Sequence, residues 1–187
     1  MSIRTERLTR DHENLGRLLL VLGSHAARVR TGEEPALLLM QGVVDYLIDW
    51  VEGEHDPVEQ LVLARLERRA RWLHALVLAH ARELHEIRLS MVELSGLLAR
   101  AQLDPLFDRD EVASAALALV TTIRRHALVE DAELLPAAEH ALDGEDWRSI
   151  ESALRTPGAR APTCGDERFE TEFRELAAEA GCNCEYA

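Results

Sequence analysis

Apolar residues recur at steps of three and four over four long stretches of this chain, at about 4–30, 35–69, 70–101 and 110–135. This spacing is typical of amphipathic helices that bury one face. The chain has no alternating strand pattern, and short connections separate the stretches. Helices of about 25 residues that are joined by short connections pack antiparallel to one another. The sequence therefore predicts an all-α protein, an up-down-up-down four-helix bundle.

Two prolines interrupt the helical pattern. Pro57 has no backbone N–H, and its ring crowds the carbonyl of Gly53, four residues earlier. We therefore expect a kink there, after which the second helix continues to about residue 69. Pro136 marks a break at the end of the fourth helix.

The chain beyond the four long stretches is expected to be helical as well. Residues 145–155 and 166–180 are predicted to form two short C-terminal helices, packed on the outside or at the end of the bundle. The predicted domain organisation is a four-helix bundle over 1–142, and a C-terminal helical extension with a Cys-containing tail over 143–187.

Charge and composition limit the partners of this protein. The chain has 34 Asp and Glu against 21 basic residues, a net charge of −13, which repels nucleic acid and anionic membranes. Met1 to His12 show no targeting signal, and no apolar run approaches the ~20 residues of a membrane-spanning helix. The three cysteines, Cys164, Cys182 and Cys184, form no disulfide framework. Cys182 and Cys184 could bind a soft metal or act as a redox pair with Cys164, but three thiols fall short of a zinc site, and we expect free thiols. We expect a cytoplasmic protein.

Histidines interrupt the apolar face of each long helix. Steps of three and four lead to His12 in the first helix, His55 in the second, His80 in the third and His126 in the fourth. A single inward histidine is more often a hydrogen-bonded core residue than a ligand, but four in register favour a shared site. His25, His74, His85 and His140 fall on flanks or near helix ends and are left out of the site.

Two of the four inward histidines are followed four residues later by a carboxylate. Glu59 follows His55 and Glu130 follows His126, which stacks each pair on one helix face. Glu133 is also expected to face inward, as a supporting carboxylate. Without a cation, buried charges in such a core would stay unpaired at several kcal/mol each. The predicted metal ligands are His12, His55, Glu59, His80, His126 and Glu130. Imidazole and carboxylate without thiolate suit iron first, with manganese or zinc possible.

The order of these residues resembles one known family. Ferritin-like proteins use Glu-x-x-His, whereas here the histidine precedes the glutamate by four residues. His12, His55-Asp56-Pro57-Val58-Glu59, His80 and His126-Ala127-Leu128-Val129-Glu130 together resemble the hemerythrin-like (HHE cation-binding) domain. The likeness extends from about residue 8 to residue 151 and so covers most of the chain.

The resemblance implies a non-haem di-iron centre with an oxo or hydroxo bridge. By that likeness, His12 and His55 hold one iron, His80 and His126 hold the other, and two glutamates bridge them. The oxygen-carrying hemerythrins have a further histidine four residues before the position of His80, where this chain has Leu76. The resemblance therefore implies an open position on the second iron for a small diatomic molecule or peroxide.

Three functions remain open at this stage. The first is a module that binds or senses O2, NO, peroxide or redox state, in signalling or stress defence. The second is a di-iron enzyme that turns over peroxide or NO, or donates iron for repair. The third, a merely structural polar core, is disfavoured by the unpaired charges it would bury. The sequence does not indicate which protein, if any, is a partner.

Overall fold

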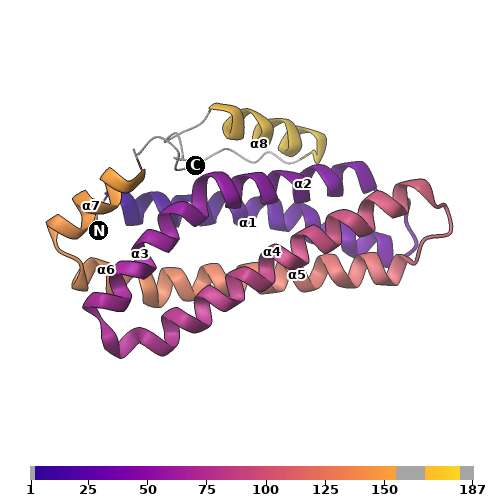
Figure 1. The fold of residues 1–187 in the computed structure, drawn as a ribbon. Coiled ribbons are helices and arrows are strands. Elements are labelled where there is room, and N and C mark those ends of the chain that lie inside the picture. Colours follow the sequence, from indigo (N-terminus) through magenta and orange to yellow (C-terminus); the bar gives the residue numbers. More distant parts are fainter. Residues whose placement is uncertain (1–2, 155–166, 182–187) are drawn as a thin grey trace.

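The chain is described from a computed structural model over residues 3–154 and 167–181 (Figure 1). The described residues are almost entirely helical and include no strand, which confirms the predicted all-α class. The helices are α1 (Ile3–Arg30), α2 (Leu37–Trp50), α3 (Asp56–Arg69), α4 (His74–Leu103), α5 (Arg109–Val129), α6 (Leu135–Ala141), α7 (Gly144–Leu154) and α8 (Glu167–Glu179). Three short turns of other helix types, η1 (Val51–His55), η2 (Arg71–Leu73) and η3 (Glu130–Leu134), join consecutive helices.

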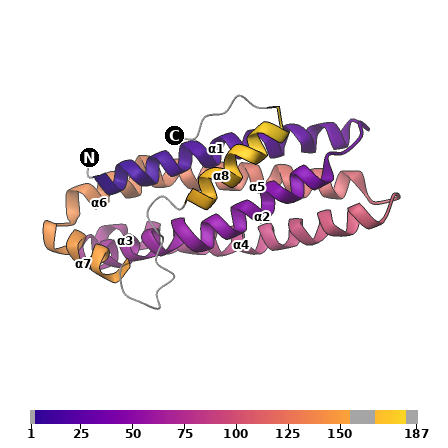
Figure 2. The same cartoon turned by 90° about the horizontal axis from the view of Figure 1, so that it is seen from above.

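The long helices lie side by side and form one elongated bundle. In the views of Figures 1 and 2, α1 runs along α5, and α2 runs along α4, in agreement with their residue contacts. Helix α4 also packs against α5. Most of the bundle is filled by a large apolar cluster from α1, α2, α4 and α5, and a second cluster lies between α3, α6 and α7. Each stretch of three-and-four periodicity therefore buries its apolar stripe.

Local sequence signals explain where the long helices stop and start. Helix α1 ends before Gly32, which adopts a φ of 85° that glycine accepts without strain. Helix α5 begins after Asp108, whose carboxylate accepts hydrogen bonds from the backbone N–H groups of Asp110 and Glu111. These two caps place the ends of neighbouring helices near one end of the bundle.

The two prolines produce widened turns of π-helix. In η1, the N–H of Asp56 reaches back five residues to the carbonyl of Val51, just before Pro57. In η3, the N–H of Leu135 bonds to the carbonyl of Glu130 in the same way, just before Pro136. An extra residue in the turn relieves the clash that proline makes with a regular helix. The expected kink near Pro57 is thus a π turn, and the helical course continues past Pro136 to Ala141 instead of ending there.

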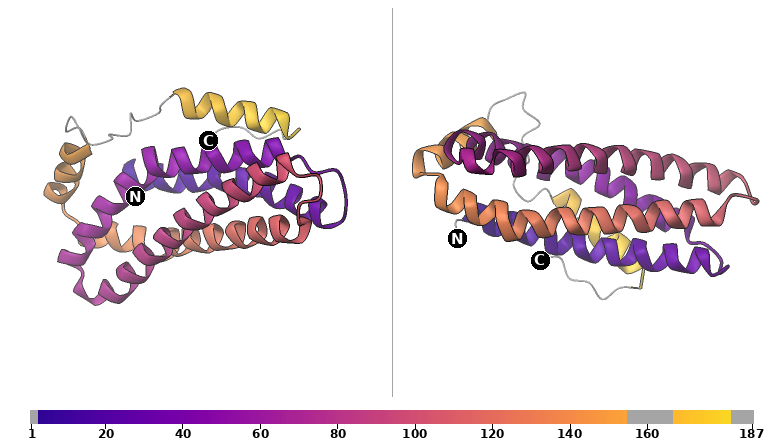
Figure 3. Two further views of the ribbon diagram at one scale, coloured as in Figure 1. Left: turned by 45° about the vertical axis from the view of Figure 1, so that its right-hand side comes forward. Right: turned by 90° about the horizontal axis from the view of Figure 1, so that it is seen from below.

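The two C-terminal helices pack on the bundle from different sides (Figure 3). Helix α7 contacts α3, and Trp147 and Ile150 complete the smaller apolar cluster. Helix α8 lies along α2, where the buried rings of Phe169 and Phe173 join the large cluster. The Phe169 ring meets Tyr46 edge-on, with centroids 5.8 Å apart. The three cysteines lie outside the described residues.

The helical stretch Arg109–Ala141 passes a length-and-composition test for a membrane span, with a mean hydropathy of 1.3 over its best window. The core helix of a globular bundle passes the same test. Here the stretch packs against α1 and α4 and carries two charged or titratable buried residues, His126 and Glu130. No other helix among the described residues passes.

Candidate metal centre

Six elements each bring one buried polar residue to the same place inside the bundle. Each of these residues is at most 8% exposed: His12 from α1, His55 from η1, Glu59 from α3, His80 from α4, His126 from α5 and Glu130 from η3. Their nitrogen and oxygen atoms form overlapping groups with spacings suited to metal ligands. The structure therefore brings together all six residues that the sequence singled out.

One side of the centre is formed by His12, His55 and Glu130. The Nε2 atoms of the two histidines lie 3.0 Å apart, and Oε2 of Glu130 is 3.2 Å from Nε2 of His12. The same oxygen lies 3.9 Å from Nε2 of His55. The ring of Trp50 lies against His55, with centroids 5.2 Å apart, and shields this side. Two imidazoles and one carboxylate thus converge on a single point.

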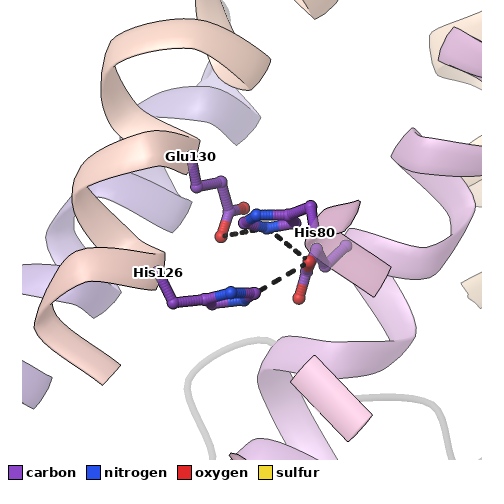
Figure 4. Close-up of side chains that lie close together, drawn as sticks. His80, His126 and Glu130 are labelled. Carbon is purple, nitrogen blue, oxygen red and sulfur yellow. Dashed lines mark ion pairs between the residues drawn. The ribbon is translucent and has the colours of Figure 1, made fainter. Parts of the chain in front are cut away.

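The other side is formed by His80 and His126 with both glutamates. Figure 4 shows three of these residues, His80, His126 and Glu130, close together. The two imidazole rings stack at 3.8 Å between centroids and are nearly parallel, at 8°. Oε1 of Glu59 lies 2.9 Å from Nε2 of His80 and 3.8 Å from Nε2 of His126. Oε2 of Glu130 lies 3.7 Å from Nε2 of His80.

The two glutamates connect the two sides. Glu130 approaches His12 and His55 on one side and His80 on the other. Glu59 places Oε2 3.5 Å from Nδ1 of His55 while its Oε1 faces His80. A carboxylate has two oxygens and can bind two cations at once. The arrangement therefore offers two adjacent ligand groups that share carboxylates.

Several fully buried atoms of these residues make no hydrogen bond of good geometry, although some lie within ion-pair distance of one another. They are both carboxylate oxygens of Glu59, Oε2 of Glu130, both ring nitrogens of His80 and Nε2 of His126. A buried polar group left unsatisfied costs about 1–3 kcal/mol, and more when it is charged. All of these atoms are metal-ligand types, so bound cations would satisfy them together.

The surroundings shift the pKa values of these groups strongly. Burial alone would lower the pKa of His80, but the nearby carboxylates of Glu130 and Glu59 raise it to about 9. The pKa values of His55 and His12 are raised in the same way, against their burial, by facing carboxylates. The pKa of Glu130 is held well below its usual range by the neighbouring histidines, again against burial. Without metal, the centre therefore holds protons on imidazoles, which cation binding must displace.

His126 differs from the other three histidines. Burial and the charge on His80 lower its pKa, and the nearby carboxylates only partly oppose this. A neutral imidazole is the form that binds metal. His126 is therefore the histidine best prepared to bind a cation without losing a proton.

A second ring of polar residues orients the histidines, and the sequence analysis does not identify it. Nδ1 of His12 donates to Oδ1 of Asp131 at 2.9 Å, and Nδ1 of His126 donates to Oε2 of Glu83 at 3.2 Å. Glu83 in turn accepts from Nε of Arg125 at 3.0 Å. Carboxylates that bond the far nitrogen of a histidine fix its tautomer and raise its basicity. Its position directly after Glu130 could have indicated Asp131. Spacing along the chain could not have indicated Glu83, because it reaches His126 from another helix.

Asp56 has a related position beside His55. Its carboxylate is buried, forms an ion pair with Arg88 of α4, and lies 4.0 Å from Nδ1 of His55. The same carboxylate raises the pKa of His55, and its ion pair with Arg88 links the start of α3 to α4. It thereby fixes the junction that carries His55 and Glu59.

The four histidines that the sequence leaves out of the site lie outside it in the structure, but the expectation for Glu133 needs a correction. His74, His85 and His140 are exposed, and His25 is partly exposed near the other end of α1. The expectation that Glu133 faces inward is wrong, because Glu133 is exposed. It lies within the π turn η3, whose extra residue rotates the following side chains away from the regular helical register.

Leu76, one turn before His80, is partly buried and packs against the smaller apolar cluster. It carries no atom that could bind a metal. Helix α4 therefore offers no further ligand one turn before His80.

Comparison with known proteins gives one match. A family model described as the hemerythrin HHE cation binding domain matches residues 4–138, a range that contains all six central residues. Comparisons with curated proteins and with solved structures found no match.

Proposed function

The chain belongs to the hemerythrin HHE cation-binding family, and on that premise we propose that its six buried polar residues hold a pair of iron ions. His12 and His55 would hold one ion, and His80 and His126 the other. Glu59 and Glu130 would bind both, because each carboxylate faces histidines of both groups.

The observation that carries this proposal is the set of buried, unsatisfied ligand atoms. A structural polar core would pair its carboxylate oxygens and ring nitrogens by hydrogen bonds. Here the outer nitrogens of His12 and His126 have such partners, whereas several atoms that point to the centre contact only one another and make no hydrogen bond of good geometry. Nitrogen and oxygen donors without thiolate suit iron, with manganese and zinc as alternatives.

We propose that the loaded centre binds or reacts with O2, NO or peroxide, in oxygen, redox or iron sensing or in stress defence. Bound iron supplies the electron transfer and ligand binding that this chemistry needs. A surface groove of about 320 Å³ between α1 and α5 supports access for a small molecule. His12 and Asp131 lie in its lining, together with Gly16 and Leu128.

The alternative is an enzyme that turns over peroxide or NO, or that donates iron for repair. Asp131 favours it, because its carboxylate lines the groove and accepts a hydrogen bond from His12. A protonatable group between solvent and the centre is what general acid–base catalysis needs. Steady turnover of peroxide or NO by the iron-loaded protein would separate this alternative from simple binding.

We propose that the four helical segments of the bundle, α1, α2–α3, α4 and α5–α6, alternate in direction, up-down-up-down. Residues 1–142 would form this bundle, and residues 143–187 would form its extension. We also propose a cytoplasmic protein that binds neither nucleic acid nor membranes, which the net charge of −13 supports.

The test is elemental analysis combined with an absorption spectrum after anaerobic iron loading and addition of O2, NO or peroxide. We expect about two irons per chain and a change of spectrum on addition of at least one of these molecules. His126→Ala should lose half or more of the iron, whereas His74→Ala, which removes an exposed histidine, should keep it. Full iron occupancy in His126→Ala would contradict the ligand assignment.

A further inference from the structure

Helix α4 carries an apolar stripe on its outer face that no described element covers. Leu78, Leu89, Val92 and Leu103 are 40%, 59%, 60% and 87% exposed. They belong to a line of positions separated alternately by three and four residues: Ala75, Leu78, Arg82, His85, Leu89, Val92, Gly96, Ala99 and Leu103. All of these positions are exposed except Gly96, which is partly buried. Single exposed apolar residues are common, but here six of the nine positions are apolar, and only Arg82, His85 and Gly96 interrupt them.

The opposite face of α4 is the one that fills the bundle. His80, Leu84, Ile87, Met91 and Leu94 are buried there. In Figure 2, α4 runs along one edge of the bundle, and α8 lies on the other side, over α1 and α2. A helix that is apolar on two faces normally has packing partners on both. Apolar residues at alternating steps of three and four are the pattern of a coiled-coil seam, and polar residues at single seam positions, as at Arg82 and His85 here, help to set its register.

Gly96 gives an independent indication that something approaches this face. A glycine inside a helix destabilises it by about 1 kcal/mol relative to alanine. Within this chain, a Cβ at Gly96 would meet only the side chain of Arg100, at an ordinary 3.6 Å. The chain's own packing therefore does not require a glycine here, and the missing side chain leaves room for a large side chain of a facing helix.

We propose that this stripe binds a second copy of this chain, with the two α4 helices antiparallel about a two-fold axis. A register that sets Leu89 opposite Val92 of the second copy also sets Leu78 opposite Leu103. In the same register, His85 faces Gly96 and Arg82 faces Ala99, so the two long polar side chains each meet a small residue, while the leucines and valine meet one another. A two-fold contact must be self-complementary in this way.

Charge complementarity selects the antiparallel pair. The chain around the start of α4 carries exposed Arg68 and Arg71, and the chain after its end carries exposed Asp104, Asp108 and Asp110. An antiparallel pair brings the basic end of each copy against the acidic end of the other, and a parallel pair brings like charges together. Antiparallel helix dipoles also attract one another.

The size of the contact is sufficient for a stable dimer. The stripe from Ala75 to Leu103 is about 42 Å long at the rise of an α-helix. A helix pair in contact over this length buries on the order of 800 Å² per copy, the size of a standard stable interface. The contact leaves the interior of the bundle, and hence the metal centre, unchanged.

The test is the mass of the full chain in solution by sedimentation or light scattering. We expect twice the chain mass of 21.0 kDa for the native protein. Leu89→Glu should halve the measured mass, because it puts two carboxylates into the middle of the seam. Leu20→Glu changes an equally exposed leucine of α1 and should remain dimeric. Helix content by circular dichroism should be unchanged in both variants.

A monomeric native protein would overturn the proposal, and so would a Leu89→Glu variant with the same mass as Leu20→Glu. The orientation has its own measurement, with a spin label at His74→Cys after replacement of the three native cysteines by serine. An antiparallel pair places the two labels about 50 Å apart along the helices. A separation within about 20 Å would mean a parallel pair or another interface.

Discussion

The two halves of the bundle share long helices but are stabilised in different ways. The half toward the α4–α5 connection is filled by aliphatic side chains such as Leu22, Met40 and Leu98, and its helices are regular. The other half buries four histidines and two glutamates, and both of its π turns hold one of them, His55 in η1 and Glu130 in η3. Hydrophobic burial determines the first half, whereas the second contains buried imidazoles and carboxylates of metal-ligand type.

This difference explains why the irregular turns lie where they do. A π turn inserts one residue and changes which side chains face the interior. Pro57 and Pro136 enforce such turns beside the centre, while the aliphatic half has no proline inside its helices. We therefore expect substitutions in the aliphatic half to change packing stability and leave metal binding intact, and the reverse for substitutions in the polar half.

The largest effect on stability is expected in the aliphatic half. Leu98 is fully buried, and Leu98→Ala should lower the free energy of unfolding by about 2–5 kcal/mol through lost burial and a cavity. Urea denaturation measures this loss, and Leu20→Ala, at an exposed position of α1, is the control with little effect. Iron content per chain should be unchanged in Leu98→Ala. Parallel loss of iron would show that the two halves are not independent.

The next effect belongs to the polar half and depends on pH and metal. The pKa of His80 is raised from 6.5 to about 9 in the folded protein, and those of His12 and His55 are raised as well. A raised histidine pKa gives stability that is complete below pH 6.5 and is lost as pH rises through the folded value. The metal-free protein should therefore lose stability between pH 6.5 and about 9. The pKa of His126 is lowered, so this histidine reduces stability as pH falls below 6.5, outside this pH window.

Metal should remove this pH dependence, because bound imidazoles are already neutral. Cation binding to the folded state adds about 2.7 kcal/mol at a hundredfold excess over Kd. Thermal melts of chelator-treated and iron-loaded protein at several pH values measure both effects. The two sets of curves should separate more as pH rises, since protons compete with metal. Identical curves at every pH would contradict a buried metal centre.

The sequence predicts the aliphatic half well because periodicity alone determines it. Helix α1 was expected at about 4–30 and spans Ile3–Arg30, and α8 was expected at 166–180 and spans Glu167–Glu179. The six central residues could be selected because each lies where an apolar stripe is interrupted. Their roles as metal ligands stay a prediction.

The polar half could be predicted only in part, for two physical reasons. The register of Glu133 depends on an inserted residue in η3, which periodicity cannot show. Glu83 reaches His126 from a neighbouring helix, so its partner depends on how α4 and α5 pack and not on spacing along one helix. The side on which α8 packs was likewise undetermined, since its apolar face fits any apolar surface.

A smaller effect is expected for the carboxylates that orient the histidines. Asp131→Asn keeps the shape of the side chain that accepts from His12 but removes its charge. Loss of such a partner typically lowers metal affinity 10–100-fold. Competition with a chelator measures the affinity, and Glu133→Gln, an exposed neighbour in the same turn, is the control. Equal affinities in the two variants would remove Asp131 from the support of the centre.

The smallest effect concerns α8 and the glycine beneath it. A Cβ at Gly42 would lie 3.0 Å from Cδ2 of Leu176, whereas a Cβ at Gly23 would meet Val120 at an ordinary 3.7 Å. Alanine in a helix is more stable than glycine by up to about 1 kcal/mol. Gly23→Ala should therefore gain most of this amount in urea denaturation. Gly42→Ala should gain little, because Leu176 must move aside, and amide hydrogen exchange in α8 should increase. If Gly42→Ala gains as much as Gly23→Ala with no change in exchange, α8 does not rest on α2 at this point.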